Sequence, residues 1–191
     1  MMKKPVSETS CSLAGDPGRR WYGMHMLIRG VVPAASPEDA LSIAKHAVFD
    51  RLVRDDVFDY YVTADMDGRG VAGTDRWGEY PAAVPADHED GHELVENGWQ
   101  ATIDEYELAF ERIDEFLESC DRCNLWEDEA THIRYSYPFY KIGQFTGTST
   151  FLYDQYGQGI RDRGHLDRVV TTPSSNRSDE TVYVVPADVH Y

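Results

Sequence analysis

The chain has 191 residues, of which 41% are hydrophobic and 12% aromatic, so it can fold around one core but is short for two. Thirty-four acidic residues against 18 basic ones give a net charge of −16, which argues against nucleic acid as a partner, because that binding depends on clustered basic groups. No segment approaches the run of about 20 apolar residues that crosses a bilayer, so no membrane association is expected.

The first 20 residues are polar, contain glycine and proline, and lack any periodicity. We therefore expect a flexible N-terminal tail over residues 1–20, followed by a single domain over residues 21–191. The stretch YGMHMLIRGVV (22–32) alternates, and it predicts a strand that is buried on one face and partly buried on the other.

The next segment, residues 36–54, carries the clearest helix pattern in the chain. Ser36 is placed as the N-cap and Pro37 as the first helical residue, two positions that these residue types favour. A strand is predicted over residues 57–64, and a strand–helix–strand unit with short joints implies two parallel strands. The expected apolar stripe of the helix comprises Ala40, Leu41, Ala44, Ala47, Val48 and Leu52.

Residues 65–97 are rich in Gly, Pro and Asp and show weak periodicity, which is typical of a loop. Within them, His88-Glu89-Asp90-Gly91-His92 satisfies the pattern H-E-x-x-H. In zinc hydrolases this pattern lies on a helix, where the two histidines bind the metal and the glutamate is the general base. His88 and His92 are thus candidate zinc ligands, and Glu89 is a candidate catalytic residue.

Three features disfavour a helix at this motif. Gly91 costs about 1 kcal/mol in a helix interior, and Pro85 lies three residues before the motif. No apolar stripe supports a helix over residues 84–93, so we interpret 86–93 as a solvated acidic loop. A third zinc ligand is available in principle from the following helix, from Glu107, Glu111 or Glu115.

A second helix is predicted over residues 100–120. Its apolar residues recur at intervals of three and four, which describes a seam that meets one surface. We expect this seam to pack on the sheet, with an intermolecular helix pair as the alternative. The seam comprises Ile103, Tyr106, Phe110, Ile113, Leu117 and Cys120, and the solvated face comprises Asp104, Glu107, Glu111, Glu115 and Glu118.

The C-terminal third predicts further strands at residues 131–140, 148–154 and 181–187, with a short helix within 158–170. The element order indicates an α+β domain in which two main helices cover one face of a mixed β-sheet. Its first half, β-α-β, resembles half of a ferredoxin-like plait in element order alone, a likeness that carries no function.

Eight aromatic residues fall between positions 135 and 156, and several arginines follow. Exposed tyrosines beside arginines are typical of protein interfaces, whereas the alternative is that these rings pack the sheet. The candidate interface residues are Tyr140, Tyr153, Tyr156, Arg161, Arg163 and Arg168.

Three cysteines, Cys11, Cys120 and Cys123, form no disulfide framework, which favours a reducing compartment such as the cytoplasm. The acidic residues are spread along the chain, and lysine occurs only at positions 3, 4, 45 and 141. This composition suits molar salt, in which the repulsion between carboxylates is screened within about 3 Å.

The sequence therefore predicts a non-enzymatic interaction or assembly module of a halophilic archaeon or its virus, cytoplasmic or virion-associated. It would need no cofactor and would bind a protein partner or itself. The alternative is a zinc-dependent hydrolase that uses the histidine pair at 88 and 92.

Overall fold

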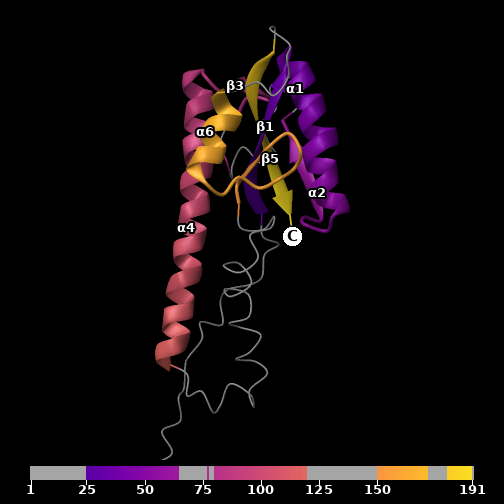
Figure 1. Ribbon diagram of the computed structural model, residues 1–191. Helices are drawn as coiled ribbons and strands as arrows, with labels where there is room; N and C mark the ends of the chain where they lie inside the picture. Colours follow the sequence, from indigo (N-terminus) through magenta and orange to yellow (C-terminus); the bar gives the residue numbers. More distant parts are fainter. Residues whose placement is uncertain (1–24, 65–76, 78–79, 120–149, 172–179, 191) are drawn as a thin grey trace, which may run out of the picture.

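In the computed structural model, a mixed five-stranded sheet stands between two layers of helices (Figure 1), which confirms the α+β class. The structure describes residues 25–64, 77, 80–119, 150–171 and 180–190. The predicted tail, the strand predicted at 131–140 and the three cysteines lie outside the described residues.

Two long antiparallel strands form the centre of the sheet, paired from His25↔His190 to Ala34↔Thr181. A parallel strand flanks this pair on the β1 side, and two short antiparallel strands flank it on the β5 side. The described sheet has the order β2-β5-β1-β4, with β3 also paired to β5. The strands are β1 (His25–Ala34), β2 (Tyr60–Thr63), β3 (Val84–Pro85), β4 (Leu152–Tyr153) and β5 (Thr181–His190).

The predicted helix over residues 36–54 is confirmed, as three consecutive segments: α1 (Pro37–Ile43), the π-helical η1 (Ala44–Phe49) and α2 (Asp50–Arg54). Ser36 caps it as expected, because its side-chain oxygen accepts a hydrogen bond from the Asp39 amide at 3.2 Å. The π turn changes the buried stripe: Phe49 is fully buried, whereas Ala47, which the sequence assigned to the stripe, is exposed.

The strands on either side of this helix run in the same direction, as a strand–helix–strand unit implies. They are not neighbours, however, because β5 is inserted between β1 and β2 and pairs antiparallel with both.

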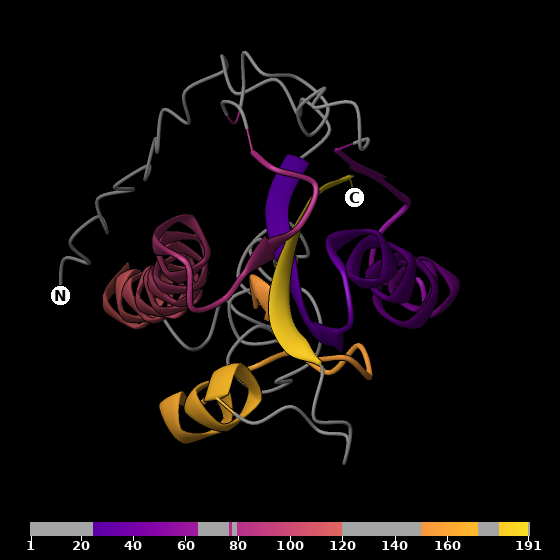
Figure 2. The ribbon, with the colours of Figure 1, turned by 90° about the horizontal axis from the view of Figure 1, so that it is seen from above.

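The helices cover both faces of the sheet, which corrects the expectation that the two main helices share one face. Viewed from above, α1 and α2 lie on one side of the strands and α4 (Glu89–Ser119) on the other (Figure 2). Ile28 and Val32 of β1 pack with α1, η1 and α2, whereas Val31 packs with α4 and α6 (Arg163–Thr171). The sequence was misleading because Arg29, on the face predicted to be partly exposed, is buried.

Helix α4 begins at Glu89, which corrects both the predicted start near Gln100 and the interpretation of 86–93 as a loop. Gly91, counted against a helix, is what allows the helix to begin here. A Cβ atom at this position would lie 2.0 Å from the carbonyl oxygen of Pro85. The first turn of α4 thus packs directly against the backbone of the segment that leads into it.

Replacing Gly91 with alanine is expected to destabilise the fold by about 1–3 kcal/mol, because backbone atoms must move to admit the methyl group. Denaturant unfolding at fixed salt measures this change. Gly164→Ala, in α6, is the matched control, since its added Cβ would meet only side-chain atoms, the nearest at 3.3 Å. That variant is expected to be neutral or slightly stabilised; equal losses in the two variants would contradict the role of Gly91.

The seam predicted on α4 does not pack on the sheet as expected, since Phe110 is 54% and Leu117 62% exposed. The C-terminal half of α4 continues past the described strands (Figure 1). Near the sheet, α4 instead buries Leu94 and Val95, and Gly98 lies against Leu152. The acidic face is exposed as predicted, at Asp104, Glu107, Glu111, Glu115 and Glu118.

Among the described helices, none combines the length and the apolar character that crossing a bilayer requires.

Candidate binding pocket at the end of the parallel strands

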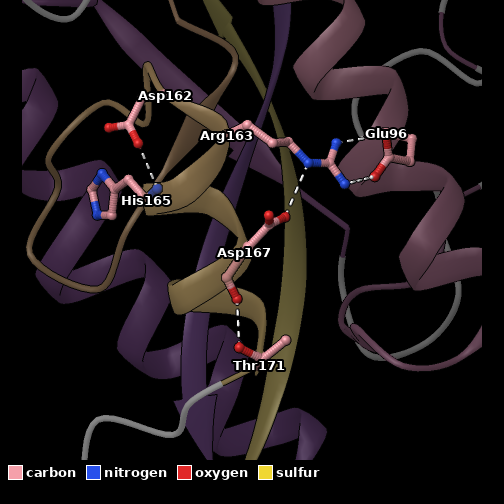
Figure 3. A network of polar contacts seen from close by, with 6 residues as sticks. All are labelled: Glu96, Asp162, Arg163, His165, Asp167 and Thr171. Atoms are coloured by element: carbon pink, nitrogen blue, oxygen red, sulfur yellow. Dashed lines mark hydrogen bonds and ion pairs between the residues drawn. The ribbon is translucent and has the colours of Figure 1, made fainter.

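Helix α6 is fixed to α4 by a charged network (Figure 3). The guanidinium of Arg163 donates two hydrogen bonds to the Glu96 carboxylate, at 2.9 and 2.7 Å, and its Nε donates to Asp167 at 3.0 Å. These hydrogen bonds hold the pKa of Glu96 below its ordinary value. Asp162 caps the helix by accepting from the His165 amide at 2.7 Å. The network orients the face of α6 that carries His165 and Arg168.

A tight turn follows β4 and is organised by one buried carboxylate. Oδ1 of Asp154 accepts hydrogen bonds from the amides of Tyr156 and Gln158, both at 2.9 Å. Gly157 has a φ of +70°, a left-handed conformation that glycine adopts without strain. The turn is also fixed from the opposite layer, because Arg51 of α2 donates to the carbonyl of Tyr156 at 2.7 Å.

Between this turn and α6 lies a pocket of about 300 Å³. It is situated at the carboxyl ends of the parallel strands β1 and β4, the end of a parallel sheet at which α/β proteins commonly bind ligands. Its size is at the lower limit for small-ligand sites. The residues that line it are Val31, Pro33, Asp154, Gln155, Tyr156, His165, Arg168 and Val169.

The polar groups of the pocket have distinct roles. Oδ2 of Asp154 lies 3.6 Å from Nε2 of His165, so this carboxylate is partnered within the pocket wall. Arg168 is exposed and makes no hydrogen bond or ion pair within the described part of the chain. Beside it, the ring of Tyr156 is 59% exposed. The pocket thus presents an available cation next to an available aromatic ring.

The pocket can bind a carboxylate beside an apolar group, because the ring of Tyr156 offers apolar area and the guanidinium of Arg168 fits a carboxylate.

A family model described as a domain of unknown function (DUF7995) matches residues 24–191. The chain belongs to the DUF7995 family. Comparisons with curated proteins and with solved structures found no match for it. The description of the DUF7995 family assigns no activity.

Of the predicted interface residues in this DUF7995 chain, Tyr156 and Arg168 are brought together in the pocket. Tyr153 is fully buried, which corrects its assignment to an exposed patch. The guanidinium of Arg163 is engaged by Glu96 and Asp167. Arg161 is exposed and lies near Tyr106 of α4. Burial raises the pKa of the Tyr106 phenol, and the charge of Arg161 offsets part of that rise. Tyr140 lies outside the described residues.

The histidine motif is now placed on the first turn of α4. His88 immediately precedes the helix, and its Nδ1 accepts the amide of Asp90 at 3.3 Å, so this ring caps the helix. His92 and Glu89 are exposed on the same turn. The helical arrangement that the zinc alternative requires is therefore present from Glu89 onward.

The proposed third zinc ligands are too distant to complete that site. Glu107, Glu111 and Glu115 are on the same helix as His92, not on a separate one, and at 1.5 Å per residue even the first is roughly 20 Å away. Within the described residues, no group of three potential ligands is placed to hold a metal ion.

Sequence reasoning missed Asp154 and His165, whose side chains lie 3.6 Å apart in the pocket wall. In the sequence, His165 has no partner at a recognisable spacing, and Asp154 is the last residue of a predicted strand. The one local signal is the run DQYGQG at 154–159. An Asp with a glycine three positions later is typical of a turn that the Asp side chain caps.

Proposed function

We propose that this protein is a non-enzymatic interaction module that binds a protein partner through the pocket between α6 and the turn after β4. The observation that carries the proposal is that one cavity brings together an exposed tyrosine, Tyr156, and the guanidinium of Arg168, which has no ion-pair partner among the described residues. Tyrosine and arginine are the residue types enriched at the energetic centres of protein interfaces.

The charge of the molecule favours a specific kind of contact. With a net charge of −16, the surface repels other acidic proteins, and an unpaired arginine in a pocket is a local exception. An aspartate, a glutamate or a C-terminal carboxylate of the partner would meet Arg168 in a partly enclosed site, where salt screens the attraction less than at an open surface. The partner is thus inferred to present a carboxylate beside an apolar group that packs on Tyr156.

The same composition supports a setting in molar salt, inside a halophilic archaeal cell or a virus of such a cell. Burial of the Tyr156 ring does not depend on charge and therefore persists when salt screens the surface. An interface built from one aromatic ring and one sheltered ion pair is consistent with that setting.

A photo-crosslinking residue in place of Tyr156 tests the proposal in an extract of the source cells at molar potassium chloride. We expect one dominant protein adduct, and we expect Arg168→Ala in the same chain to reduce it at least tenfold, the loss produced by removing about 1.4 kcal/mol of binding energy. Arg54→Ala, which removes an exposed arginine of α2 outside the pocket lining, is the matched control.

The position of the crosslink has its own control. Tyr60 is 47% exposed and belongs to β2, which does not contribute to the pocket. The same adduct from positions 60 and 156, or an adduct that Arg168→Ala leaves unchanged, would contradict the proposed docking site.

A further inference from the structure

The side chain of Arg29 is buried beneath α4. It belongs to the central strand β1, and the residue is 5% exposed. Gly98 of α4 lies directly on its aliphatic part, since a Cβ on Gly98 would come within 2.9 Å of Cδ of Arg29. The glycine therefore allows the helix to close over the arginine, and substitution there would displace its stem.

Within the described residues the guanidinium has one hydrogen bond: Nη1 donates to the carbonyl of Leu27 at 2.5 Å. Nε is buried and finds no acceptor in that part of the chain. No carboxylate of the described residues lies within ion-pair distance of this arginine. The edge of the guanidinium formed by Nε and Nη2 is therefore unused, and that edge holds two parallel N–H groups.

A second unsatisfied donor belongs to the same region. Nε1 of Trp77 is also buried without an acceptor. Trp77 and Tyr80 both pack against the small cluster of Leu27 and Ala64, and the carbonyl of Leu27 is the acceptor of the Arg29 hydrogen bond. Buried polar groups in folded proteins are almost always paired, so an orphan donor on Arg29 and another on Trp77, beside the same cluster, indicate that an acceptor is missing.

A buried charge without a counter-ion is costly, by several kcal/mol. Burial lowers the pKa of Arg29 to about 10, against a smaller opposing effect of Tyr80. Since this value still exceeds neutral pH, the arginine carries its charge in the folded protein, and deprotonation does not remove the cost.

We propose that Arg29 binds a small carboxylate anion through the Nε and Nη2 edge of its guanidinium. A carboxylate supplies the missing negative charge, and its two oxygens match the two parallel donors. Trp77 and Tyr80 also line a cavity of about 320 Å³, but its lining includes Asp90 and Glu93 and does not include Arg29, so this cavity is not part of the proposed site.

Exchange of potassium chloride for potassium acetate at constant ionic strength tests this site. When acetate reaches about ten times its Kd, we expect the melting temperature of the native chain to rise by about 3–6 °C relative to chloride. Arg29→Met should lose this rise, and it should still fold, because an apolar side chain of similar length replaces a buried ion. Arg54→Met, at an exposed arginine, should keep the rise.

Arg29→Lys and direct detection of the ligand provide a second measurement. Lysine retains the charge but not the two parallel donors, so acetate should bind this variant at least several-fold more weakly. Saturation-transfer NMR with acetate reports binding without reference to stability. Equal melting shifts in the native chain and Arg29→Met, no preference of acetate over chloride, or an unchanged transfer signal in Arg29→Lys would each overturn the proposal.

Discussion

Replacing Tyr153 with alanine is expected to lower the free energy of unfolding by about 3–5 kcal/mol, the range for truncating a fully buried aromatic residue. Tyr153 exposes none of its surface and belongs to the cluster formed with α1, η1 and α2. Its ring meets that of Phe58 edge-on, with the centroids 6.4 Å apart. The alanine variant loses this packing and leaves a cavity between β4 and the helix layer. Thermal unfolding followed by circular dichroism measures the loss.

The chain contains a matched control three residues away. Tyr156→Ala makes the same chemical change at a ring that is 59% exposed, and it should alter stability by less than about 0.5 kcal/mol. Tyr156→Ala can also be tested in the crosslinking assay. With the crosslinking residue at another position in the pocket, Tyr156→Ala should abolish the partner adduct. Similar stability losses in both variants would mean that Tyr153 is not a core residue.

The different environments of these two tyrosines could not be predicted from the alternation of the sequence. Strand β4 is two residues long and is covered on both sides, so Leu152 and Tyr153 are buried in different clusters. Alternation distinguishes an inner from an outer face only when one face of a strand meets solvent. In a three-layer arrangement, side chains on both faces of the strand are buried. The first exposed ring is therefore Tyr156, in the turn that follows the strand.

Local chemistry predicted the first helix well, whereas it failed at the start of α4. Ser36 and Pro37 act on the backbone within a few residues of themselves, so their role at the start of the helix can be predicted from the sequence. Gly91 acts through a contact with Pro85 across a turn. Helix propensity describes an isolated helix and takes no account of such a contact. A glycine that weakens an isolated helix can therefore be the residue that permits it in the folded chain.

The pocket illustrates a second limit of sequence reasoning. Val31, Asp154 and His165 line it together, although more than 100 positions separate the first from the other two. What joins them is the parallel pairing of β1 with β4 and the Arg163–Glu96 ion pair that fixes α6 against α4. The sequence suggested tyrosines and arginines as the useful residue types; only the pairing of the strands selects Tyr156 and Arg168 among them.

Transfer from about 1 M to about 10 mM potassium chloride is expected to unfold the protein, because the screening length grows from about 3 to about 30 Å and the carboxylates then repel across the whole molecule. Part of this repulsion arises between exposed acidic residues of α4. Glu107, Glu111 and Glu115 follow one another at intervals of four residues, an arrangement that is unfavourable for like charges on a helix.

Circular dichroism across a salt titration measures the transition, and a triple variant tests its cause. Glutamine at positions 107, 111 and 115 removes three exposed charges without disturbing a buried contact, since all three glutamates face solvent. The salt concentration at the midpoint should fall in this variant. Matched substitution of the three exposed polar residues Ser42, Asn97 and Gln100 by alanine should leave the midpoint in place. A native chain whose spectrum is unchanged at 10 mM salt would remove the argument for a halophilic setting, because its acidic residues would then need no screening to remain folded.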